Sequence, residues 1–156
     1  MTRPSIGGIH HLKFTVSDLD SSLKFYERAL GARRLRELDH RRPDGELFAY
    51  ILEIDGLGAY LEIRLLPTSA KAEAGRDHLT LTVDTRDELE AWRQHFEDVS
   101  VPHSPLLTGI VGWLLVVEDP DHRRIRFYTR ETHAFGEGVS SDPYWLGTEH
   151  ESQKAS

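Results

Sequence analysis

The sequence predicts an α+β protein built from two copies of one βαβββ module. Two observations carry this prediction. A stretch that begins at His11 is repeated from His78, and each copy passes from a strand pattern directly into a helix pattern. When the copies are aligned on the two histidines, the identical pairs are Leu12 and Leu79, Thr15 and Thr82, Val16 and Val83, and Asp20 and Asp87.

The first copy begins with alternating residues at 8–16, typical of a half-buried strand. One predicted face carries Leu12, Phe14 and Val16, and the other carries His11, Lys13 and Thr15. A helix is expected next, because Asp18 suits an N-cap, apolar residues recur at helical spacing, and Gly31 can end it. Three strand-like runs follow near residues 33–38, 47–54 and 59–66, separated by the turns RRPDGE and DGLG.

The second copy repeats this order after a small-residue, polar stretch at 67–76. It contains a strand at 78–83, a helix at 85–97 with Leu89, Trp92 and Phe96 facing inward, and strands near 105–108, 112–117 and 123–129. We therefore assign residues 1–66 to the first module, 67–76 to a linker, 77–130 to the second module and 131–156 to a C-terminal tail. In the tail, Pro143–Leu146 is apolar enough to pack on the body or on a partner, and TEHESQKAS is expected to be disordered.

Composition narrows the class of partner. The 156 residues carry a net charge of −7 and no cysteine, which excludes disulfides and thiolate chemistry. A basic stripe with interleaved aromatic residues is missing, so nucleic acid is not an expected partner. No apolar run is long enough to span a bilayer, and no secretory signal is visible, so we expect a cytoplasmic protein without a membrane partner.

Four motifs together resemble the vicinal oxygen chelate superfamily, the group of glyoxalases, bleomycin-resistance proteins and extradiol dioxygenases. They are HHLKFTVSDLDSSLKFYERALG, AYLEIRL, DHLTLTVDT and VVEDPDHRRIRFYT, and the resemblance covers residues 8–130. It implies a glyoxalase-like fold, in which two βαβββ modules form a curled mixed sheet around a cleft. It also implies a divalent metal in that cleft and a homodimer.

The resemblance places the metal-ligand positions at His11, Glu62, His78 and Arg126. Strand alternation puts these positions on the cleft-facing side of the predicted sheets. A guanidinium has no lone pair for a cation, so three ligands remain: His11, Glu62 and His78. This set suits Fe, Mn, Ni or Zn with open coordination positions, and Glu62 is also the expected catalytic residue.

Substrate binding is expected from basic and aromatic side chains on the same side. Lys13, Arg64, Arg124 and Arg126 predict a cationic cleft and therefore an anionic ligand. The expected substrate-binding residues are Lys13, Tyr60, Arg64, Trp113, Arg126 and Tyr128. Arg126 either anchors the substrate or pairs with Glu62 and replaces the metal. The other six histidines (His40, His95, His103, His122, His133 and His150) are expected at surface or turn positions.

Two functions follow. The first is a metal-dependent enzyme of isomerase, lyase or dioxygenase type that acts on a small anionic or oxygen-chelating substrate through the His/Glu/His site. The alternative is a metal-free small-molecule binding or drug-sequestering protein of the bleomycin-resistance type, with a pocket lined by Tyr50, Tyr60, Trp113 and Tyr128.

Overall fold

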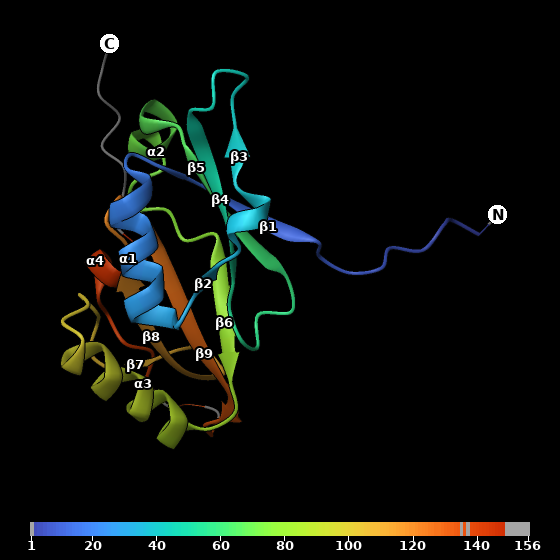
Figure 1. The fold of residues 1–156 in the computed structure, drawn as a ribbon. Helices are drawn as coiled ribbons and strands as arrows, with labels where there is room; N and C mark the ends of the chain where they lie inside the picture. The colour runs from blue at the N-terminus through green and yellow to red at the C-terminus, as the bar shows by residue number, and fades with distance from the viewer. Residues whose placement is uncertain (1, 135, 137, 149–156) are drawn as a thin grey trace, which may run out of the picture. The chain divides into compact units, whose positions relative to one another are not determined.

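The computed structural model describes residues 2–134, 136 and 138–148, and the chain divides into two compact units, Met1–Ala72 and Glu73–Ser156. Each unit combines one sheet of parallel and antiparallel strands with one long helix (Figure 1). The predicted α+β class with two similar modules is therefore confirmed. Within the described part of the chain, no helix is both long and apolar enough to cross a bilayer.

Unit 1 forms a five-stranded sheet in the order β1-β5-β4-β2, with β3 paired to β4. The first and last strands, β1 and β5, pair in parallel, and the other pairs are antiparallel. Its elements are β1 (His11–Val16), α1 (Leu19–Leu30), β2 (Arg33–Arg34), the 3-10 helix η1 (Arg36–Leu38), β3 (His40–Arg41), β4 (Leu47–Glu53), β5 (Tyr60–Leu65) and α2 (Pro67–Ala72).

Helix α1 begins and ends where the sequence predicts. The side chain of Asp18 accepts a hydrogen bond from the Ser21 amide at 2.7 Å, and Gly31 has a φ of 65°, the left-handed conformation that favours glycine. The helix packs on β4 and β5, and its Tyr26 ring lies 6.2 Å from that of Phe14 on β1. The apolar face of β1 therefore looks toward α1, and its polar face looks away.

Two expectations for unit 1 were wrong in detail. Of the strand predicted at residues 33–38, only Arg33–Arg34 joins the sheet, because Arg34 folds over the Tyr50 ring and binds Asp39 across η1. The predicted linker contains the helix α2. Pro67 occupies its first position, where a missing amide hydrogen costs nothing, and Ala70 of the same helix is buried.

Unit 2 forms a four-stranded sheet in the order β6-β9-β8-β7. Its first and last long strands, β6 and β9, again pair in parallel. The strand predicted from His78 begins one residue later, so His78 precedes β6. The elements are β6 (Leu79–Val83), α3 (Arg86–Asp98), β7 (Leu107–Thr108), β8 (Gly112–Glu118), β9 (Arg124–Thr132) and α4 (Pro143–Leu146).

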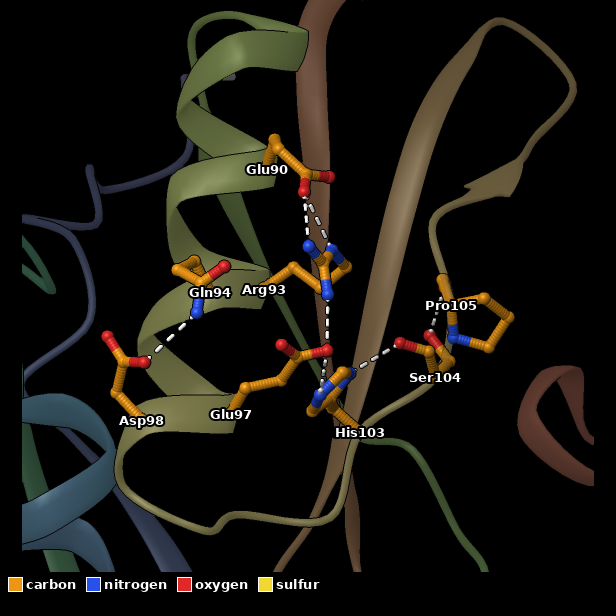
Figure 2. A network of polar contacts seen from close by, with 8 residues as sticks. All are labelled: Glu90, Arg93, Gln94, Glu97, Asp98, His103, Ser104 and Pro105. Atoms are coloured by element: carbon orange, nitrogen blue, oxygen red, sulfur yellow. Dashed lines mark hydrogen bonds and ion pairs between the residues drawn. The ribbon is translucent and has the colours of Figure 1, made fainter.

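Helix α3 covers one face of the unit 2 sheet. Thr85 and Glu88 form a capping box at its start, and the rings of Trp92 and Phe96 lie 4.9 and 5.4 Å from that of Phe127. Figure 2 shows the polar contacts between the helix and the loop that follows it, where Arg93 binds both Glu90 and Glu97 and Glu97 reaches His103. The hydroxyl of the next residue, Ser104, accepts a hydrogen bond from the Val116 amide and so fixes this loop to β8.

A buried ion pair holds the turn between β8 and β9. Arg123 and Asp119 are 1% and 3% exposed, and the guanidinium donates to Asp119 at 3.0 Å and pairs with Glu73 at 3.2 Å. Asp119 also accepts the amides of Asp121 and Arg123. The carboxylate thus organises the EDPDH turn as well as neutralising the buried cation.

We expect Asp119→Ala to lower the free energy of unfolding by about 3–5 kcal/mol, since it leaves a buried guanidinium without its main partner. Asp55→Ala removes an Arg–Asp pair of similar length at the surface of unit 1, and we expect little change there because water screens that pair. Urea titration of both variants measures the difference. Equal effects would contradict this account of the turn.

Candidate functional site

The parallel pairing of β1 and β5 brings five of the predicted site residues to one face of unit 1. His11 lies opposite Tyr60, Lys13 opposite Glu62, and Thr15 opposite Arg64. Partners in a parallel pair project to the same side, so His11, Lys13, Tyr60, Glu62 and Arg64 share the face turned away from α1. The face predicted from strand alternation is therefore found in the structure.

Glu62, the predicted carboxylate ligand, is buried between two basic side chains. It is 2% exposed, its Oε2 lies 2.8 Å from Nε of Arg64, and its Oε1 lies 3.3 Å from Nε2 of His40. Both carboxylate oxygens therefore already have a partner within unit 1. Arg64, expected to face a substrate, instead neutralises its neighbour on the same strand.

His40 and Phe48 are site residues that the sequence did not reveal. His40 lies on β3 opposite Ala49, and a register shift in the β3–β4 pairing follows it. The Phe48 ring lies 5.7 Å from that of His40 and 5.4 Å from the guanidinium carbons of Arg42 and Arg64. The available signal was the RRPDGE turn, which makes residues on either side of it hairpin partners.

His11 remains exposed on the polar face of unit 1. Its Nδ1 lies 2.9 Å from Nδ1 of His10, whose ring is 5.9 Å from that of Tyr60. His10 and Tyr60 also border an open depression of about 450 Å³ against the loop that joins β4 to β5. This depression lies beside His11 rather than around Glu62.

Taken by itself, neither unit forms a site for a divalent cation among its described residues. Within the described residues of either unit, no three His, Cys, Asp or Glu side chains are placed so that they could hold a metal. In unit 1 the carboxylate of Glu62 is compensated by Arg64 and His40. In unit 2 a guanidinium, Arg126, stands at the equivalent position of the last strand.

The basic residues of unit 2 are also compensated. Arg126 forms an ion pair with Asp77 and donates from Nη2 to the Leu146 carbonyl at 2.9 Å, and Arg124 lies 3.9 Å from Glu118. Glu62 and Arg126 each have a partner within their own unit, and the alternative of a Glu62–Arg126 pair stays a prediction. Asp77 directly precedes His78 in the DHLTLTVDT motif, which was the signal for it.

The face of the unit 2 sheet that carries Arg124 and Arg126 is covered by α4. Trp145 and Leu146 pack on a buried cluster of Leu107, Leu114 and Val116, and Tyr128 joins them. The guanidinium carbon of Arg124 lies 4.3 Å from the centroid of the Tyr144 ring. Pro143–Leu146 thus packs on unit 2, which is one of the two alternatives that the sequence left open. Of the predicted disordered end, residues 149–156 lie outside the described residues.

Tyr144 fastens α4 to Glu118. Its hydroxyl donates to Glu118 Oε2 at 2.7 Å, and His122 contacts the other oxygen. Burial opposes ionisation of Glu118, but the hydrogen bonds from His122 and Tyr144 and the charges of His122 and Arg124 outweigh it, so its pKa lies below the ordinary value. The hydrogen bond to Glu118, with some burial, raises the pKa of Tyr144. The contact therefore joins a neutral phenol to a carboxylate at neutral pH.

The predicted aromatic residues do not gather in one place. Tyr128 lies on the Arg126 face, where its hydroxyl accepts hydrogen bonds from the amides of Val111 and Gly112. A Cβ at Gly109 would stand 2.3 Å from that hydroxyl oxygen, so only glycine fits there. Trp113 instead lies beneath Arg86 at the start of α3. Tyr50 is a core residue whose hydroxyl donates to Asp20.

The two modules, the parallel pairing of the first and last long strands in each, and the position of Glu62 define a class of protein. The chain belongs to the Glyoxalase/Bleomycin resistance protein/Dioxygenase superfamily, which it matches over residues 8–127. It is 25% identical over 124 residues to the putative ring-cleaving dioxygenase MhqA of Bacillus subtilis (strain 168). The match covers 77% of this chain and 39% of that protein, so the chain spans well under half of that relative.

Solved structures share the fold at low identity. TnmS3, an antibiotic binding protein from Streptomyces sp. CB03234, has a TM-score of 0.64 at 20% identity, with 83% of this chain and 100% of TnmS3 covered. A mutant of the fosfomycin resistance protein FosX from Listeria monocytogenes, complexed with Mn(II) and 1S,2S-dihydroxypropylphosphonic acid, has a TM-score of 0.61 at 16% identity. That likeness covers 80% of this chain and 93% of FosX. A divalent metal is thus present in a protein of this fold.

We expect Arg64→Ala to lower the free energy of unfolding by about 1–3 kcal/mol, because it leaves the buried Glu62 carboxylate with His40 alone. The double variant Glu62→Ala/Arg64→Ala should lose less than the sum of the two single losses, by about 0.5–3 kcal/mol, since the pair is in direct contact. Chemical denaturation of the four proteins of this cycle measures the coupling. Arg42→Ala, which removes a guanidinium from the same Phe48 ring but not from Glu62, is the matched control, and strictly additive losses would contradict the pairing.

Proposed function

We propose that this chain binds a small aromatic compound and that it does so without a metal ion. The observation that carries the proposal is the state of Glu62. A carboxylate that is to bind a cation must offer its oxygens, whereas both oxygens of Glu62 lie against Arg64 or His40 in the interior of unit 1. Exchanging these partners for a metal would leave a guanidinium beside a divalent cation, which like-charge repulsion disfavours.

The charge on the two sheet faces favours a ligand without strong negative charge. Of the four basic residues expected to make the cleft cationic, Arg64, Arg124 and Arg126 each have a carboxylate partner, and only Lys13 has none within ion-pair distance among the described residues. The aromatic side chains Tyr144 and Trp145 lie against Arg124, and Tyr128 packs on the apolar cluster of the same sheet face. Flat rings and guanidinium groups together suit an aromatic ligand.

The comparison with TnmS3 supports this choice. The likeness covers the whole chain of TnmS3, and the name of that protein describes antibiotic binding rather than a reaction. At 20% identity the likeness itself concerns the fold alone, so the proposal rests on the paired carboxylate and the aromatic residues. Assembly as a homodimer and a location in the cytoplasm stay predictions.

A second candidate is a metal-dependent enzyme of isomerase, lyase or dioxygenase type acting on a small anionic or oxygen-chelating substrate. The relative MhqA, described as a putative ring-cleaving dioxygenase, favours it, as does the exposure of His11 on β1. His11, Glu62 and His78 would hold Fe, Mn, Ni or Zn, with Glu62 also the catalytic residue. This candidate requires Glu62 to release Arg64 and His40.

We expect protein treated with EDTA to bind 2-acetylnaphthalene saturably, and the affinity to be the same after addition of Mn(II), Fe(II), Ni(II) or Zn(II). Calorimetric or fluorescence titration measures the binding, and elemental analysis of the purified protein measures its metal content. The physical reason is that the carboxylate of Glu62, the expected metal ligand, already pairs with Arg64 and contacts His40.

Three histidine variants separate the two candidates. If one equivalent of metal is present in the wild type and in His95→Ala, a control on α3, but is lost in both His11→Ala and His78→Ala, the metal-dependent candidate replaces the first. A requirement for metal in the binding of 2-acetylnaphthalene would do the same. The absence of any saturable binding would reject the proposed function.

A further inference from the structure

The segment that ends in α4 rests on unit 2 by a small number of contacts. Ser140 exchanges hydrogen bonds with Thr108, Tyr144 reaches Glu118, and Trp145 and Leu146 lie on the cluster of Leu107, Leu114 and Val116. The helix itself is only four residues long, and its own stability is therefore small. Its place on the sheet depends on these few attachments.

Two groups of α4 act on the sheet as parts of a ligand would. The Trp145 ring covers apolar side chains, and the neighbouring Leu146 carbonyl accepts a hydrogen bond from Arg126 Nη2 at 2.9 Å. An aromatic ring joined to one neutral oxygen acceptor therefore occupies the surface on which the sequence placed a substrate. The segment supplies both groups from the chain itself.

Arg126 keeps one donor that α4 does not satisfy. Among the residues that the structure describes, its Nε is buried and has no hydrogen-bond partner. Nε and Nη2 form one edge of the guanidinium, and Nη2 already contacts Asp77 and the Leu146 carbonyl. A buried donor without an acceptor costs free energy, so a ligand oxygen placed at this edge would gain a contact that α4 leaves unmade.

The charges around the Nε–Nη2 edge of Arg126 favour a neutral ligand oxygen over a charged one. Arg124 and Arg126 face Glu118 and Asp77, two cations against two carboxylates. An additional carboxylate would gain Arg126 but would be repelled by Asp77, which a neutral carbonyl oxygen avoids. The acceptor that α4 already presents there is of this neutral kind.

We infer that α4 is a displaceable internal ligand: Trp145 and Leu146 hold the place of a flat aromatic compound with a neutral carbonyl oxygen, such as an aromatic ketone. Binding moves α4 from the sheet, puts the ring of the compound on Leu107, Leu114 and Val116, and gives its oxygen the Nε–Nη2 edge of Arg126. This inference rests on the proposed function. It names the class of the ligand and identifies α4 as the segment that competes with that ligand. The Tyr144–Glu118 hydrogen bond is the latch of α4.

The experiment compares three probes of the same ring size in EDTA buffer: 2-acetylnaphthalene, 2-naphthoate and 2-ethylnaphthalene. We expect the ketone to bind about 2- to 10-fold more tightly than the hydrocarbon, the gain from one hydrogen bond, and more tightly than the carboxylate. Hydrogen exchange of the Trp145, Leu146 and Thr148 amides, which are bonded within the segment, should become faster in the ketone complex. This readout follows the displacement directly.

Variants test the latch and the edge separately. Tyr144→Phe should tighten binding of the ketone by about 2- to 10-fold, because it loosens the competitor by one hydrogen bond. Val139→Ala, an exposed position of the same segment, should leave affinity unchanged.

Arg126→Gln should remove the preference for ketone over hydrocarbon, whereas Arg130→Gln, an exposed arginine of the same strand, should retain it. Arg126→Lys keeps a cation for Asp77 but lacks the planar edge, so it should also lose the preference. This second variant keeps the test valid if Arg126→Gln does not fold.

The outcomes distinguish this inference from the function on which it rests. Saturable binding of the ketone with unchanged or slower exchange in α4, or with no effect of Tyr144→Phe, would overturn the displacement and leave the binding function standing. Tighter binding of 2-naphthoate than of the ketone would overturn the neutral-oxygen assignment. If neither the wild type nor Tyr144→Phe binds any of the three probes, the proposed function and the inference both fall.

Discussion

The parallel pairing between the first and last long strands of each module is the constraint on which both sheet faces depend. It sets Lys13 opposite Glu62 in unit 1 and Thr80 opposite Arg126 in unit 2. Because Lys13 and Thr80 are equivalent in the internal repeat, Glu62 and Arg126 hold the same register position, one as an anion and the other as a cation. Each lies on the face away from the long helix, and each has an oppositely charged partner within its own unit: Arg64 for Glu62, which His40 also contacts, and Asp77 for Arg126. The two copies of the module therefore share a backbone position but carry opposite charges at it.

Local patterns predicted the parts of the fold that depend on periodicity and caps. Helix α1 runs between Asp18 and Gly31, and α3 follows Thr85, because side-chain oxygens and a left-handed glycine mark these ends in the sequence itself. The errors fall where a long-range contact decides the conformation. Arg34 closes onto Asp39 and Tyr50 and so interrupts the strand expected at 33–38, and burial of Ala70 stabilises a helix in a stretch without helical periodicity. Neither contact has a local signature.

The same distinction explains what could be predicted of the candidate site. Alternation along β1, β5 and β9 assigned side chains to the correct face, because a strand has a fixed period of two. It could not assign partners on that face. Glu62 and Arg64 are two residues apart on one strand and therefore neighbours, yet the pairing also needed His40, which reaches Glu62 through a hairpin with an irregular register. The expected positive charge was a sum over side chains pointing one way. In unit 2 it is balanced by Asp77, which precedes β6, and by Glu118, the last residue of β8, which pair with Arg126 and Arg124.

Compensation of charge has different consequences in the two units because their faces are covered differently. In unit 1 the compensated carboxylate of Glu62 is itself buried. Loss of Arg64 would leave it with His40 alone and would destabilise the unit. In unit 2 the compensated guanidinium lies under a short helix, and one of its donors has no acceptor among the described residues. A fully paired cluster resists exchange of its partners, whereas an incompletely satisfied donor beneath a weakly attached segment gains from exchange. The face of unit 2 is therefore the one on which a small molecule has free energy to gain, even though the residue types of unit 1 more closely match the metal ligands expected for the family.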